Sequence, residues 1–136
     1  MNNLLAAIVD KFANSALYND VGGRIYLDEA PQGTEFPYVV FRIVAGTPEN
    51  TFQEDIEDVL IQISLFSISA GATEITTMYS DLQTLLDRQT LTITGGVCVN
   101  LLRQGLVTMI DDITTPAGTA SCKHWAADYS VMYQTA

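Results

Sequence analysis

The stretch that decides the fold reads VGGRIYLDEAPQGTEFPYVVF and covers residues 21–41 of the 136-residue chain. The adjacent glycines at 22–23 permit the positive φ with which a helix commonly ends, and the Pro-Gln-Gly at 31–33 favours a turn. Pro37 can begin an extended run, because the first residue of a strand needs no amide donor. This stretch therefore predicts the end of a helix, a short strand, a turn and a long strand, in that order.

An amphipathic helix is predicted before the glycines. Residues 2–17 carry apolar side chains at helical spacing, so that one stripe of the helix can cover a sheet. These side chains are Leu4, Leu5, Ile8, Val9, Phe12 and Ala16. After the glycines, residues 24–27 predict a short strand. Residues 38–44 are rich in β-branched and aromatic side chains and predict a longer strand that closes near Gly46 and Pro48.

A long strand and a second helix are predicted in the middle of the chain. The side chains of residues 59–67 alternate so that one face of the strand is apolar and the other is mixed. We expect the mixed face to meet a helix or a neighbouring subunit. The apolar face consists of Val59, Ile61, Ile63 and Leu65. Residues 75–86 have helical spacing, and Glu74 and Arg88 have the charges that favour the two helix ends.

The remaining sequence predicts β structure. We expect strands at residues 90–94, 97–110 and 121–134, with a turn at the glycines 95–96 and a loop at 111–119. One face of the last strand would carry Trp125, Ala127, Tyr129, Val131 and Tyr133. The predicted fold is α+β, a mainly antiparallel sheet with two helices packed on one face as a two-layer sandwich.

Size and charge suit one small acidic domain that spans residues 1–136. The formal net charge is −10, which argues against binding to nucleic acid phosphates or to an anionic membrane. The first apolar run, residues 4–9, is too short for a signal peptide or a membrane span. Cys98 and Cys122 match no zinc or thioredoxin spacing. Free thiols in a cytosolic chain are the favoured interpretation, and a disulfide between neighbouring strands stays open.

Two acidic segments are the candidate interaction sites. We expect residues 46–58 to form a protruding acidic loop or hairpin, in which an isolated aromatic residue is suited to anchor a partner. The second segment begins the predicted loop at 111–119, which could become ordered on a partner subunit. The candidate interface residues are Phe52, Glu54, Asp55, Glu57, Asp58, Asp111 and Asp112.

The sequence gives little support for chemistry. Cys122, His124 and Asp128 would share one strand face and could imitate a nucleophile, a base and an orienting acid. Their Cα atoms would be spaced about 7 and 13 Å along the strand, which is too far apart for a compact triad. The acidic cluster at 54–58 lacks the residue order of a calcium loop, and no phosphate-binding motif is present. No cofactor or metal is predicted.

The order of turns, strands and helices in this chain resembles that of the tail completion, or tail terminator, proteins of long-tailed bacteriophages. The resemblance rests on residues 21–26, 30–33 and 37–41, and on the bend at 46–48. The strand at 59–67, the helix at 75–86 and the closing residues Trp125, Ala126, Ala127, Asp128, Tyr129 and Tyr133 extend it over nearly the whole chain.

The resemblance implies a structural virion protein and no catalytic residues. Such a protein would form a ring, a hexamer, at the head-proximal end of the tail tube, end polymerisation of the tail tube protein and present a surface to the head completion or connector protein. It would be assembled in the host cytoplasm, and DNA would pass through an acidic lumen without specific binding. Two other classes stay open: a small hydrolase-like enzyme that uses Cys122, His124 and Asp128, and a monomeric regulatory binding module.

Overall fold

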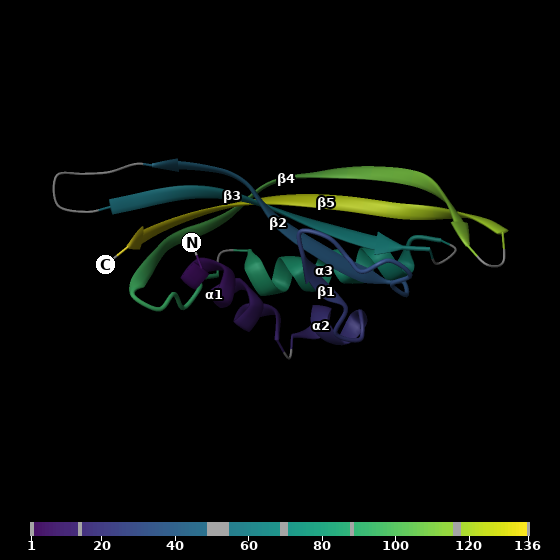
Figure 1. Cartoon of the computed structure of the whole chain (residues 1–136), viewed down its shortest axis with the longest axis horizontal. Helices are drawn as coiled ribbons and strands as arrows, with labels where there is room; N and C mark the ends of the chain where they lie inside the picture. The colour runs from purple at the N-terminus through teal and green to yellow at the C-terminus, as the bar shows by residue number, and fades with distance from the viewer. Residues whose placement is uncertain are drawn as a thin grey trace.

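The protein consists of one sheet covered on one face by helices (Figure 1). The computed structural model describes residues 2–13, 15–48, 55–68, 71–87, 89–115 and 118–135. The helices are α1 (Asn2–Phe12), α2 (Ala16–Asp20) and α3 (Thr73–Leu86). The strands are β1 (Ile25–Leu27), β2 (Tyr38–Pro48), β3 (Asp55–Ser67), β4 (Gly96–Thr115) and β5 (Gly118–Thr135).

The sheet has the strand order β1-β2-β3-β5-β4. The pairs β2–β3, β3–β5 and β4–β5 are antiparallel, and only the short β1 runs parallel to its neighbour β2. The predicted α+β class, with a mainly antiparallel sheet and its helices on one face, is therefore confirmed.

The core lies between the helices and one face of the sheet. The predicted apolar face of β3 is buried. The predicted face of β5 is also buried, except that Trp125 is only partly so. From the helices the core receives Leu4, Ala7, Ile8, Phe12, Leu17, Ile75, Met78, Leu82 and Leu86. These helical positions recur every three or four residues, which is the spacing that gives an α-helix one apolar side.

Hydrogen bonds join the residues that follow α2 to the start of β2, in the order of elements that residues 21–41 predict. Gly22 and Gly23 both have positive φ, 57° and 80°. The guanidinium of Arg24 donates from Nε to the carbonyl of Pro37 at 3.0 Å. The amide of Val39 donates to the carbonyl of Arg24 at 2.9 Å. These bonds place β1 beside β2 after the chain has turned through the loop at 28–37.

Three details of the sequence prediction are wrong. The helix predicted at 2–17 is divided, because Ser15 caps α2 by accepting from the amide of Tyr18 at 3.1 Å. Residues 90–94 form no strand, although Leu91 and Ile93 are buried in the core. The loop predicted at 111–119 is a continuation of the β4–β5 ladder, which pairs residues through Thr115 and Gly118.

The ladders are longer than the helices that cover them. The paired ends of β2 and β3 project past the helices at one end of the sheet, and those of β4 and β5 project at the other end (Figure 1). Residues 46–48 continue β2 and residues 55–58 begin β3, so the described part of the acidic segment is a hairpin arm. Thr47, Asp55, Asp111 and Asp112 are exposed polar residues of these arms. Polar residues at successive positions remove the alternation that identifies a strand from sequence.

Candidate interaction surface

Two of the predicted acidic interface residues are bonded to β5. Glu57 accepts a hydrogen bond from the hydroxyl of Tyr133 at 2.7 Å, and Asp58 accepts one from the hydroxyl of Ser130 at 2.7 Å. Burial, followed by the hydrogen bond to Glu57, raises the pKa of Tyr133 to about 12. Asp55 begins β3, whereas Phe52 and Glu54 lie outside the described residues. Two carboxylates of the acidic arm, those of Glu57 and Asp58, therefore bind it to β5.

The second acidic pair lies in β4. Asp111 is opposite Cys122 in the ladder, and Asp112 is opposite Ser121. Both aspartates are exposed. One carboxylate oxygen of Asp111, Oδ2, lies 4.0 Å from Nδ1 of His124. The structure thus places Asp111 and Asp112 far along a strand, at the end of the sheet opposite to the arm that carries Asp55.

The three residues considered for catalysis do not form a triad. The thiol of Cys122 is buried and donates weakly to the carbonyl of Lys123 at 3.8 Å. Burial, assisted by the charge of Asp111, raises the pKa of Cys122, so that the thiol stays protonated at neutral pH. His124 faces Asp111 and not Asp128, and burial lowers its pKa against the opposing effect of Asp111. This arrangement lacks the activated nucleophile that covalent catalysis requires.

The face of the sheet opposite to the helices has no covering layer in the described part of the chain (Figure 1). Strand register brings two rows of mostly apolar side chains across this open face. The first row joins Tyr38, Phe66, His124 and Met109, and the second joins Val40, Ser64, Ala126 and Val107. This face includes the mixed face of β3 that we expected to meet a helix or a neighbouring subunit, and no helix covers it.

Aromatic rings stack along the first row. The ring centroids of Tyr38 and Phe66 are 4.7 Å apart, and those of Phe66 and His124 are 4.3 Å apart. Phe36 adds a tilted ring, with its centroid 5.0 Å from that of Tyr38. Stacked rings lose little further freedom when a partner covers them, which suits them to interfaces.

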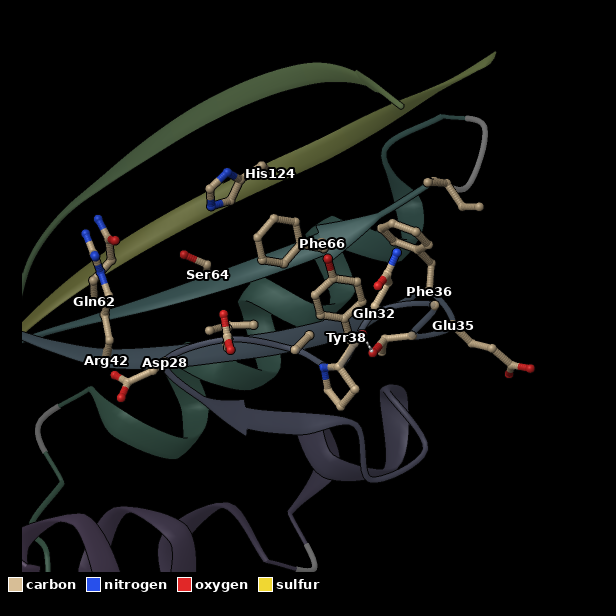
Figure 2. Close-up of a pocket in the computed structure, with 17 residues that line it drawn as sticks. Asp28, Gln32, Glu35, Phe36, Tyr38, Arg42, Gln62, Ser64, Phe66 and His124 are labelled. Atoms are coloured by element: carbon tan, nitrogen blue, oxygen red, sulfur yellow. Dashed lines mark hydrogen bonds between the residues drawn. The ribbon is translucent and has the colours of Figure 1, made fainter. Parts of the chain in front are cut away.

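The loop at 28–36 rises beside these rings and makes one wall of a groove of about 1060 Å³ (Figure 2). Tyr38, Val40, Phe66 and His124 form the floor, and Arg42 lies with Gln62 at one end. Acidic side chains of the wall, Asp28, Glu29 and Glu35, are exposed. Buried within the floor, Nε2 of His124 has no hydrogen-bond partner among the described residues. We call this feature the aromatic groove.

The edge strand β4 carries an unusual share of exposed apolar side chains. Of the eleven large hydrophobic residues that are exposed in the described chain, six belong to β4. They are Val97, Val99, Leu102, Val107, Met109 and Ile110. Long apolar edge strands readily pair with other chains, and soluble proteins usually protect them.

A polar cluster fixes α3 to the sheet beneath the edge strand. Asp87, which follows α3, accepts from the hydroxyl of Tyr129 at 2.7 Å and pairs with Arg103 of β4 at 3.3 Å. Arg103 also bonds to the hydroxyl of Tyr79, whose ring packs edge-on against Trp125. This cluster makes the position of β4 relative to the helices well defined.

No group of three or more His, Cys, Asp or Glu side chains within the described ranges is arranged to hold a metal ion. Both cysteines are free. None of the helices in the described part of the chain is long and apolar enough to cross a membrane.

Comparison with known proteins gives the family. Residues 4–133 match the family described as "Tail completion protein gp17", and the chain belongs to this family. It is a structural protein of the phage tail and a component of the virion, as the resemblance noted from the sequence implies. Curated protein sequences give no significant match.

A solved structure shares the fold. A chain from the "Virion of native gene transfer agent (GTA) particle" superimposes with a TM-score of 0.57 at 16% sequence identity. The similarity covers 90% of this chain and 91% of that chain. At this identity the likeness shows the fold alone, and family membership favours a structural over a catalytic role.

The open face and the aromatic groove are absent from the sequence prediction for a physical reason. Their rows are formed by residues from four strands, and only the register brings these residues together. The signal that could have indicated them is the run Leu106, Val107, Thr108, Met109 and Ile110. Four of these five residues are apolar, and they fall on both faces of a strand.

Proposed function

We propose that this protein caps the head-proximal end of the phage tail tube as a ring, most simply a hexamer. The ring would end polymerisation of the tail tube protein and offer a surface to the head completion or connector protein. Each subunit would be one domain, assembled in the host cytoplasm. Membership of the tail completion family carries the proposal, and the uncovered apolar sheet face supports it, because such a face is suited to contacts between subunits.

The net charge supports passage of DNA through such a ring. With a formal charge of −10, the protein repels phosphate, so DNA would move through the lumen without specific binding. Enzyme function is not part of this proposal, because Cys122 and His124 lack the arrangement of a nucleophile and its base.

The test is a deletion of the gene followed by electron microscopy of the tails. We expect tails of irregular and excessive length that fail to join heads, and restoration of normal length by the intact gene. Tails of normal length and full infectivity after the deletion would refute the capping role.

The acidic arm at 46–58 is the proposed contact with the adjoining tail tube or the neighbouring subunit. Phe52 would be its apolar anchor, and its acidic residues Glu54, Asp55, Glu57 and Asp58 would face a basic patch or the lumen. Asp111 and Asp112 would contribute at the opposite end of the sheet. Hydrogen exchange of residues 46–58 should slow when the free subunit enters assembled tails, and equal exchange in both states would rule out this contact.

A further inference from the structure

The segment at 106–110 of β4 is an unprotected strand edge. The register of β4 with β5 shifts between Cys98 and Asn100 and between Arg103 and Gly105, but is regular beyond Gly105. Bulges of this kind protect an edge strand from pairing with other chains, so the protection stops where the segment begins. No strand in the described part of the chain pairs with the outer edge of β4. The segment contains no charged residue.

Side chains of this segment are apolar on both faces of the sheet. Val107 and Met109 belong to the open face, and Val107 is 55% exposed. Ile110 points to the side of the sheet that carries the helices and is 73% exposed, the highest value among the exposed large hydrophobic residues of the described chain. A strand that is apolar on both faces is typical of strands covered on both sides. Something outside the subunit is therefore expected to enclose this edge.

The aromatic groove has the form that such an edge needs. Its floor is apolar and open, and its wall at 28–36 stands at the side of β1 and β2, which is the sheet edge opposite to β4 (Figures 1 and 2). A five-residue strand segment is about 16 Å long, and a groove of about 1060 Å³ is large enough for its side chains.

We propose that the segment at 106–110 of one copy inserts into the aromatic groove of a second copy, with Ile110 as the anchor over Val40 and Phe66. This contact is heterologous, because it joins two different surfaces at opposite edges of one sheet, and repeated contacts of this type close into a ring when the rotation between neighbouring copies divides a full turn. The inference rests on the proposed ring and names the surfaces that would build it.

Charge favours this occupant. The segment is uncharged, as is the floor except for Arg42 at one end, and Arg42 makes no ion pair with another described residue. Asp111 and Asp112 follow the segment directly, so a copy seated along the floor can bring the exposed carboxylate of Asp112 to Arg42. The three carboxylates of the wall, Asp28, Glu29 and Glu35, are exposed and can stay in water at the rim.

The experiment uses two variants that each lose one surface. Ile110→Glu places a charge on the inserted edge and leaves the groove intact, because Ile110 lies on the opposite side of the sheet from the groove. Val40→Glu places a charge on the floor and leaves β4 intact. Val97→Glu is the matched control, because Val97 is also on β4 and is 61% exposed, but lies outside the segment. Circular dichroism and thermal melting verify the fold, and Val40→Thr replaces Val40→Glu if the latter does not fold.

Sedimentation velocity of the full chain, alone and with tail tube protein, measures assembly. We expect Ile110→Glu and Val40→Glu to weaken self-association by about 30-fold each, as loss of a central buried anchor does, while Val97→Glu assembles like the wild type. An equimolar mixture of the two defective variants should form a dimer and nothing larger, because it retains one intact groove and one intact edge.

Three outcomes would overturn the inference: wild-type protein that stays monomeric in both conditions, defective variants that assemble normally, or a mixture that forms no dimer. The capping role is tested separately by tail length. If Ile110→Glu assembles normally and restores tail length in the deletion strain, the ring stands and the interface is wrong. If the deletion leaves tails normal, the capping role itself is wrong.

Discussion

Replacing Tyr129 by phenylalanine tests the polar cluster that fixes α3 to the sheet. The ring of Tyr129 is completely buried, and its hydroxyl donates to Oδ1 of Asp87 at 2.7 Å. Burial and the hydrogen bond to Asp87 raise the pKa of Tyr129 far above its ordinary value, so the hydroxyl is a donor at every physiological pH. The substitution removes this single bond and preserves the ring in the core.

A hydrogen bond to a charged group contributes about 1.5 to 3 kcal/mol to stability. The lower figure applies here, because Asp87 keeps its ion pair with Arg103 at 3.3 Å and its side chain is 28% exposed to water. We therefore expect Tyr129→Phe to lower the free energy of unfolding by about 1.5 kcal/mol. For a chain of 136 residues this corresponds to a decrease in Tm of about 5 °C.

Urea unfolding and differential scanning calorimetry measure the two quantities. Tyr26→Phe is the control, because the hydroxyl of Tyr26 has no hydrogen-bond partner among the described residues, and its effect should stay within about 0.5 kcal/mol. If Tyr129→Phe proves no more destabilising than Tyr26→Phe, the cluster does not hold α3 in the way described.

Two further predictions concern pH and the cysteine. Burial, a hydrogen bond to Asp81 and the charge of Asp81 raise the pKa of Asp20 from 3.8 to about 6. The stability that protonated Asp20 provides is complete below pH 3.8 and is lost as the pH rises through 6. Asp20→Asn should therefore flatten the dependence of the unfolding free energy on pH between these values. Because Asp20 is exposed, the unfolding free energy that Asp20→Asn gains at pH 7 should stay below about 1 kcal/mol. Cys122→Ser and Asp128→Asn should each support normal tail length in the deletion strain, and loss of function with an unchanged fold would revive the enzyme hypothesis.

Sequence patterns predicted the layers of this fold better than its edges. Val59, Ile61, Ile63 and Leu65 alternate where β3 faces the helices, and the physical cause of that alternation, one buried face, also made it recognisable. Asp111 and Asp112 are charged and exposed at successive positions, so the sequence shows no alternation there and their strand resembled a loop. The acidic candidates could be named from composition, but the aromatic groove depends on pairing between strands far apart in sequence.

The strand order also determines when, during synthesis of the chain, the groove floor and the β4 edge can form. β5 follows the other four described strands in the chain but lies between β3 and β4, and its register joins Asp55 to Thr135. Pairings so distant in sequence form slowly, and none of them can form on the ribosome until β5 has emerged. His124 of the groove floor belongs to β5, and β4 has no partner strand before β5 arrives. A nascent chain without β5 therefore lacks His124 of the groove floor and the partner strand of β4, so we expect it to be unable to make the proposed contact between copies.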